Sequence, residues 1–142
     1  KPVACRTAGG RLPGGAIDRV STVMKVARAN GVALPNAGHL ARLYGSRLPK
    51  LLAILDANPD LCSPLSPSGD IGAQILLAIR GEMALTLEDV VMRRTGIGQE
   101  GDPGPMALES AATLMAAECG WSETRRRAEI DSVATIFRNS RA

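Results

Sequence analysis

The chain has 142 residues, of which 45% are hydrophobic and 22% are charged, and its formal net charge is +3. This length fits one domain with enough apolar residues for a buried core. The interspersed charges exclude a long basic tail for nucleic acid, and no apolar run approaches the roughly 18 residues that span a bilayer. Aromatic residues make up only 2%. The core must therefore be aliphatic, which favours packed helices over a β-sandwich.

The first half of the chain joins short apolar-periodic segments through glycine and proline. Residues 1–15 are rich in both and are predicted to form a linker or docking strap. Because the sequence opens without a methionine, we interpret it as a fragment of a longer protein. Apolar residues at helical spacing predict a helix over residues 16–30. Asn36 is predicted to cap the next, short helix, and Pro49 to lie in the first turn of the one after it.

The second half opens with residues 59–69, which hold three prolines and are predicted to be a loop. A helix is predicted over residues 71–84. Another begins at Thr86, with Asp89 three residues later in a capping-box-like arrangement. The last two predicted helices cover residues 105–119 and the segment capped by Ser122. We thus expect an all-α domain over residues 16–142, with about seven helices in a compact orthogonal bundle-like arrangement and no strand.

Gly96 to Gly101 match the dinucleotide-binding pattern G-x-G-x-x-G letter for letter. That pattern binds pyrophosphate between a strand and a helix, where backbone N–H groups and the helix dipole meet the phosphates. Here a predicted helix precedes it, and the carboxylates of Glu100 and Asp102 would repel phosphate. We therefore interpret residues 96–104 as a flexible loop between helices.

His39 is the only histidine, and the cysteines are Cys5, Cys62 and Cys119. Together they would make a zinc site, but no two of them have the close pair spacing that structural zinc sites use. A helix-surface histidine and small buried thiols fit the sequence better. With one histidine and no Ser-His-Asp order or paired carboxylates, the sequence assigns no catalytic, cofactor-binding or metal-binding residue.

Arg125, Arg126 and Arg127 open the last predicted helix. Three adjacent arginines fan around a helix instead of sharing one face. They could contact phosphates in a helix-turn-helix reader of nucleic acid, but a solvated helix face is the more common use of such a run.

The stretch from Arg80 to Gly98 has the densest charge beside an apolar stripe. Leu87, Val90 and Val91 stand at i, i+3 and i+4 and are predicted to be buried. The charged residues around this stripe allow two interpretations. One is a helix with surface ion pairs, each worth roughly 0–1 kcal/mol. The other is a set of arginines held at an interface by bidentate carboxylate pairing, and the sequence leaves both open.

Three segments carry a resemblance to a known family: LARLYGSR (40–47), CSPLSPSGDIGAQILLAIRGEMALTLEDVVMRRTGIG (62–98) and LMAAECGWSETRRRAEI (114–130). They are similar to the C-terminal helical domain of FAD-dependent, aerobic-type glycerol-3-phosphate dehydrogenase. The signature parts are YGSR, R-x-E-M-A-x-T-L-E-D-V-x-x-R-R-T and L-M-A-x-E-x-G-W. The strap CRTAGGRLPGG resembles the join to the preceding domain. The glycine-rich loop 96–104 departs from the more apolar connection of that pattern.

The resemblance implies an upstream flavin domain that binds FAD and, with an adjoining substrate domain, oxidises sn-glycerol 3-phosphate to dihydroxyacetone phosphate. Electrons then pass to membrane quinone. It also implies a bacterial, cytoplasmic enzyme peripheral to the inner membrane, without a nucleic-acid partner. The present chain would be its C-terminal accessory domain, docked on the catalytic part and inactive alone. On this basis the framework and docking residues are expected to be Arg80, Glu82, Asp89, Arg93 and Arg94.

Two other functions stay open at this point. One is a free-standing helical module that binds a protein through residues 80–94. The other, less favoured, is a helical nucleic-acid binder that uses residues 125–127.

Overall fold

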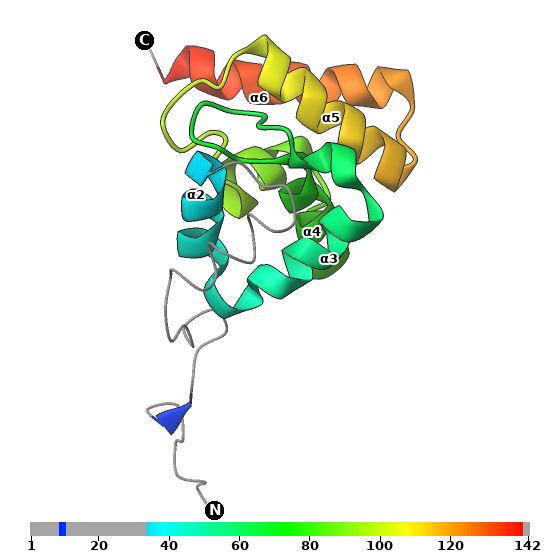
Figure 1. Ribbon diagram of the computed structural model, residues 1–142. Coiled ribbons are helices and arrows are strands. Elements are labelled where there is room, and N and C mark those ends of the chain that lie inside the picture. The colour runs from blue at the N-terminus through cyan, green and yellow to red at the C-terminus, as the bar shows by residue number, and fades with distance from the viewer. Residues whose placement is uncertain (1–8, 11–33, 141–142) are drawn as a thin grey trace, which may run out of the picture.

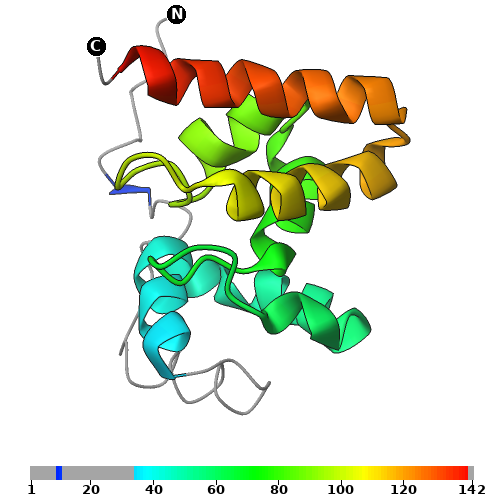
Figure 2. The same cartoon turned by 90° about the horizontal axis from the view of Figure 1, so that it is seen from above.

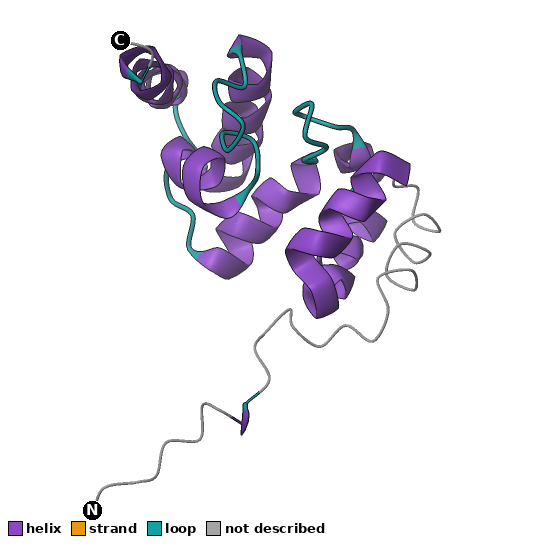
Figure 3. Ribbon diagram, turned by 90° about the vertical axis from the view of Figure 1, so that its left-hand side faces the viewer, coloured by secondary structure: helices purple, strands orange, loops and turns teal. Residues whose placement is uncertain are grey.

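The computed structural model describes residues 9–10 and 34–140 of the chain (Figure 1). This part is mostly helical and forms no strand, with one isolated antiparallel bridge between Pro64 and Ile71 (Figure 3). The predicted all-α class is therefore confirmed. The α-helices of the described part are α2 (Leu34–Tyr44), α3 (Leu48–Ala57), α4 (Gly72–Glu82), α5 (Pro105–Cys119) and α6 (Glu123–Asn139).

The described residues thus hold five α-helices, against about seven predicted, for two reasons. The helix predicted over residues 16–30 lies outside the described residues. The helix predicted from Thr86 is a π-helix, η4 (Asp89–Arg94), instead of an α-helix. Two 3-10 turns join the other elements: η2 (Gly45–Arg47) and η3 (Pro59–Cys62).

Most predicted helix boundaries are found where the sequence places them. Pro49 lies in the first turn of α3, where its missing N–H costs nothing. Gly120 ends α5 in the left-handed region, with φ 66°. The Ser122 side chain caps α6 by accepting a 3.2 Å hydrogen bond from the Arg125 backbone N–H. The predicted cap at Asn36 is wrong, because α2 begins two residues earlier and places Asn36 inside its first turn.

Helix α4 is the centre of the described part, since every residue from Gly72 to Ala78 is buried. Ile75 and Ala78 belong to one apolar cluster, shared with the π-helix, α5 and α6. Ala73 and Leu77 belong to a second cluster, shared with α2 and α3. A helix that is apolar on all sides is stable only when neighbours cover each side. In Figure 2, α5 and α6 lie side by side on one side of α4, and α2 and α3 lie on the other. No helix within residues 34–140 is both long enough and apolar enough to cross a bilayer.

Candidate functional site

The turn before the π-helix has a reciprocal cap, as the Thr86–Asp89 spacing predicts. The Asp89 carboxylate accepts hydrogen bonds from the backbone N–H groups of Leu85 and Thr86, both at 3.1 Å. In return, the Thr86 hydroxyl accepts from the Asp89 N–H at 3.2 Å. Burial raises the pKa of the Asp89 carboxyl, but these hydrogen bonds and the nearby Arg93 outweigh it and hold the pKa below its usual value. Asp89 is therefore engaged in fixing this turn.

The end of the π-helix is set by Thr95. Its hydroxyl and its backbone N–H both donate to the carbonyl of Val90, at 2.7 and 3.0 Å, across five residues. This wide turn buries Val90 and Val91, together with Leu87, as the predicted stripe requires. The same turn leaves Arg93 and Arg94 exposed next to each other. Turns of this kind are rare and are often found at functional sites.

Two ion pairs tie the end of α4 to its neighbours. Arg80 binds Glu118 of α5 in a bidentate pair, with Nε–Oε1 at 2.6 Å and Nη2–Oε2 at 2.8 Å. These hydrogen bonds raise the pKa of Arg80 and lower that of Glu118. Glu82 pairs with Arg47 of η2, with Oε1 2.8 Å from Nη2. The pairs join the two halves of the domain at one end of α4.

The two arginines of the π-helix differ. Arg93 pairs with Asp89 of its own helix at 3.1 Å and with Glu88, the residue just before that helix, at 2.6 Å. Arg94 has no ion pair or hydrogen bond with any described residue. Its side chain lines a surface hollow of about 210 Å³ between η2, the end of α4 and the π-helix. The lining residues are Leu43, Tyr44, Arg47, Glu82, Arg93, Arg94, Thr95 and Gln99.

The structure thus brings three of the five predicted docking residues into one hollow: Glu82, Arg93 and Arg94. Arg80 is directed instead toward α5, and Asp89 toward the start of the π-helix.

A second charged site, centred on Asp70, is absent from the sequence-based predictions. The Asp70 side chain is fully buried just before α4. One carboxylate oxygen accepts from the backbone N–H of Gly96 at 3.0 Å and from Gln74 at 2.9 Å, and lies 3.1 Å from His39 Nε2. The other oxygen accepts from the hydroxyls of Ser66 and Ser68, at 3.0 and 2.8 Å.

The environment of Asp70 stabilises its charged form. Burial raises the pKa of the carboxyl, but hydrogen bonds from Ser68, His39, Gly96 and Gln74 together outweigh burial and lower it. Asp70 also lies next to the N-terminus of α4, where negative charge is favoured. We call this set of bonded residues the Asp70 hub: His39, Ser66, Ser68, Asp70, Gln74 and Gly96.

Gly96 and Gly98 lie where neighbouring atoms leave no room for a side chain. A Cβ on Gly96 would lie 2.9 Å from Asp70 Oδ2, and one on Gly98 would lie 2.8 Å from Val91 Cγ1. Residues 95–98 are buried. The predicted loop between helices is therefore present, but its first part is packed against the domain, and within residues 95–104 the exposed ones are 99–102. The Gly96 N–H, which a phosphate would need, is donated to a carboxylate, so these residues do not fit a dinucleotide.

The described cysteines and histidine do not gather into a metal site. His39 is bonded to Asp70, and no group of three potential ligand side chains occurs within the described residues. The prediction of buried thiols is wrong for Cys119, which is exposed, and Cys62 is half-buried. Cys5 lies outside the described residues.

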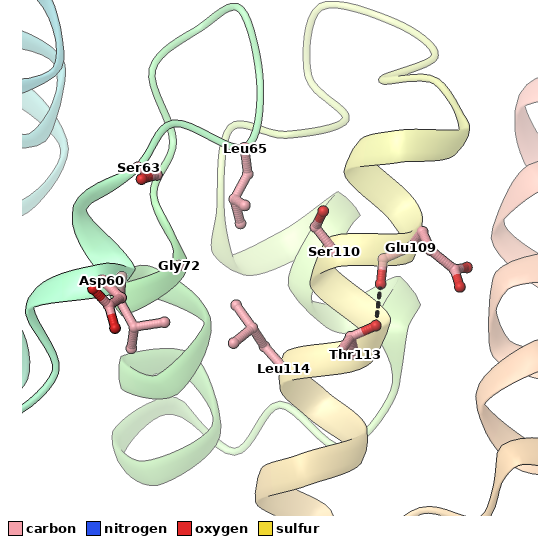
Figure 4. Close-up of a pocket in the computed structure, with 9 residues that line it drawn as sticks. Asp60, Ser63, Leu65, Gly72, Glu109, Ser110, Thr113 and Leu114 are labelled. Atoms are coloured by element: carbon pink, nitrogen blue, oxygen red, sulfur yellow. Dashed lines mark hydrogen bonds between the residues drawn. The ribbon is translucent and has the colours of Figure 1, made fainter.

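A groove of about 360 Å³ lies between the 59–65 segment and α5 (Figure 4). Leu61, Leu65 and Leu114 supply its apolar surface, and Asp60 and Glu109 are the acidic residues that line it. The Thr113 hydroxyl donates to the carbonyl of Glu109 at 2.8 Å. No histidine lines the groove, so its hydroxyls have no base of that kind for nucleophilic catalysis.

The arginine run on α6 is engaged within the domain. Arg125 lies over the Trp121 ring, with its guanidinium carbon 4.8 Å from the ring centroid. Arg126 pairs with Glu109 and Glu123, and Arg127 pairs with Glu123 at 2.7 Å. Hydrogen bonds from Arg126 and Arg127 lower the pKa of Glu123 to about 2. This neutralisation weakens the case for a nucleic-acid surface here.

Comparison with known proteins identifies the family of the chain. Residues 5–126 match the family described as the C-terminal domain of alpha-glycerophosphate oxidase. The glycerol-3-phosphate dehydrogenase of Synechocystis sp. is 39% identical over 87 residues, which are 60% of this chain and 16% of that protein. That of Mycobacterium leprae is 30% identical over 105 residues, which are 72% of this chain and 18% of that protein. A probable mitochondrial glycerol-3-phosphate dehydrogenase of Dictyostelium discoideum is 28% identical over 95 residues, 66% of this chain and 15% of that protein.

The chain therefore spans about a sixth of the length of these curated relatives. The family match covers most of the described helices, including α4, the π-helix and α5. The chain belongs to the family defined by the C-terminal domain of alpha-glycerophosphate oxidase, as its motifs predict.

Proposed function

We propose that this chain is the C-terminal accessory domain of a flavin-dependent glycerol-3-phosphate dehydrogenase. The upstream part of that enzyme would oxidise sn-glycerol 3-phosphate to dihydroxyacetone phosphate and pass electrons to quinone. The observation that carries the proposal is the match of residues 5–126 to a C-terminal domain family, together with relatives that are glycerol-3-phosphate dehydrogenases. In this proposal residues 1–15 are the strap to the upstream part, and residues 16–142 are the accessory domain.

The FAD of this enzyme belongs to the upstream part, because the described residues do not fit it. The glycine segment 96–98 is closed on Asp70 and Val91, and a helix precedes it in place of a strand. We therefore propose that no step of the oxidation takes place on residues 34–140. Its contribution is to hold a surface in place against the catalytic part.

Arg80, Glu82, Asp89, Arg93 and Arg94 are proposed as framework and docking residues of this domain. Arg80, Glu82, Asp89 and Arg93 pair with other described residues, which supports a framework role. Arg94 supports docking, because its charge is not neutralised by any acidic residue of the described part. Arginines at interfaces commonly bind carboxylates of the partner.

We place the parent enzyme in the cytoplasm of a bacterium, at the surface of the inner membrane. Two of the relatives named above come from bacteria. Quinone is a membrane component, so an enzyme that reduces it must reach the membrane surface.

The test compares the full reading frame that encodes this chain with residues 1–142 alone. We expect the long protein to carry bound flavin and to reduce a quinone analogue when sn-glycerol 3-phosphate is added. The 142-residue chain should be colourless and inactive. Flavin bound to the short chain would contradict the proposal. A reading frame without a further domain would support the free-standing interaction module instead.

A further inference from the structure

The turn between α4 and the π-helix exposes two large apolar side chains. The exposed fraction is 82% for Met83 and 67% for Leu85, while Ala84 between them is fully buried. Large apolar residues gathered on one short turn mark an interaction site more often than scattered ones do.

This turn is held rigidly from several directions. The backbone N–H groups of Met83 and Ala84 both donate to the carbonyl of Ala78. The Leu85 N–H donates to Asp89 at 3.1 Å, and the Leu85 carbonyl accepts from Arg125 of α6 at 3.4 Å. The two exposed side chains are therefore presented by an ordered backbone, which lowers the entropy lost when a partner binds.

The backbone of Met83 points to a role outside the fold. Its φ is 61°, and among the described residues it is the only non-glycine residue with positive φ. Glycine or asparagine is favoured at such a helix end, and methionine is the less stable choice. Because the Met83 side chain is almost fully exposed, packing within the domain does not explain it. An unfavourable backbone state that carries an exposed apolar side chain indicates a binding function.

The charges next to this turn indicate what a complementary partner surface would present. Glu82, which precedes Met83, lines the hollow that also holds Arg94. Three arginines and one glutamate line that hollow, and Arg94 has no acidic partner among the described residues. A complementary surface would thus offer a carboxylate to Arg94 beside an apolar depression for Met83 and Leu85.

We propose that Met83 and Leu85 anchor this domain to the upstream part of its own polypeptide, with Arg94 binding a carboxylate of that part. The inference rests on the proposed function. The occupant follows from the relatives, of which this chain covers only about a sixth, so most of each protein lies outside the matched region. An apolar centre with a polar rim is the usual composition of an interface.

Met106 is a matched internal control for Met83. It is 83% exposed and lies in the first turn of α5. The other end of α5 is the one near Met83, because Glu118 there binds Arg80 of α4. At 1.5 Å per residue, Met106 lies roughly 18 Å along the helix from Glu118. Both methionines should thus react equally with an oxidant unless a partner covers one of them.

The experiment is methionine oxidation of the full-length protein by dilute hydrogen peroxide, followed by mass spectrometry. Oxidation of methionine to its sulfoxide follows exposure of the sulfur. We expect Met83 to react about tenfold more slowly in the folded protein than after unfolding in urea, with Met106 much less protected. If Met83 reacts as fast in the folded protein as in urea, the docking proposal is wrong.

Variants of the full-length protein test the apolar and the charged parts of the proposed docking surface separately. Leu85→Asp and Arg94→Glu should each speed Met83 oxidation several-fold, because they weaken docking. Arg138→Glu, at the far end of α6, should leave the rate unchanged. Protection that falls on dilution would mean that a second copy covers the turn, which would overturn the proposed occupant.

Flavin content and glycerol-3-phosphate oxidation are measured on the same samples. An active flavoprotein with reactive Met83 would refute this inference alone, and a protected Met83 without flavin would refute the enzyme assignment alone.

Discussion

Asp70 and Arg80 are charged residues near opposite ends of α4, and they differ in burial and in the number of their hydrogen-bond partners. The Asp70 side chain is fully buried and bonded to five other residues, whereas the Arg80 side chain is 49% exposed and bonded to Glu118. A buried charge that loses its partners is costly, while an exposed ion pair is screened by water. We therefore expect the Asp70 hub to hold the fold, and the paired charges at the other end of α4 mainly to shape a surface.

Replacing the hub carboxylate should have the largest effect. Asp70→Ala leaves the Gly96 N–H and the Gln74 amide without their acceptor in a buried site, so we expect a loss of about 3 kcal/mol of unfolding free energy. Urea unfolding of the purified chain measures it. Asp56→Ala, on the exposed face of α3, is the control and should change stability by about 0.5 kcal/mol or less. Equal effects of the two substitutions would mean that the hub is not a stability centre.

Acid should reproduce part of this loss. The pKa of Asp70 is lower in the folded chain than in the unfolded chain. The unfolded state therefore binds the proton more readily, and the stability that Asp70 contributes is present above its unfolded pKa of about 3.9. This contribution is lost as pH falls below that value, through the folded pKa. Urea midpoints between neutral and acidic pH should show the decline, and the decline should be shallower in Asp70→Asn. An equally steep curve for that variant would assign the acid sensitivity to other carboxylates.

Substitution of Gly98, which packs against Val91 of the π-helix, should have the next largest effect on stability. In Gly98→Ala the new Cβ would lie 2.8 Å from Val91 Cγ1 and 3.0 Å from Phe137 Cζ. Because both neighbours are buried, we expect a loss of about 2 kcal/mol. Gly81→Ala in α4 meets only Leu77 Cδ1 at 3.7 Å and should instead stabilise the chain by about 0.5 kcal/mol. Thermal unfolding should show a lower midpoint temperature for Gly98→Ala and a higher one for Gly81→Ala. If both midpoints rise, the neighbours of Gly98 move to accommodate the added methyl group, and the packing argument is wrong.

The sequence predicts the helices better than it predicts the hub. Local signals place the starts and ends of α3 and α5 and the start of α6, because proline, glycine and a serine cap act within one turn. The π-helix escapes prediction because over six residues its apolar pattern also fits an α-helix. The bonds from Asp70 to His39 and Gly96 span 31 and 26 residues. Such contacts leave no periodic signal, although the cluster of serine, glycine and aspartate before α4, followed by Gln74, is itself a helix-start pattern.

The smallest effect is expected from the ion pair at the other end of α4. A double-mutant cycle with Arg80→Ala and Glu118→Ala should give a coupling of about 0.5–1 kcal/mol, because both side chains are partly exposed and the pair is screened. The bidentate geometry places the value toward the upper end of that range. Raising the salt concentration should reduce this coupling and leave the Asp70→Ala loss nearly unchanged, because screening acts on exposed charges far more than on buried ones. A coupling as large as the Asp70 loss, or one insensitive to salt, would mean that both ends of α4 hold the fold in the same way, and the distinction between hub and surface would fail.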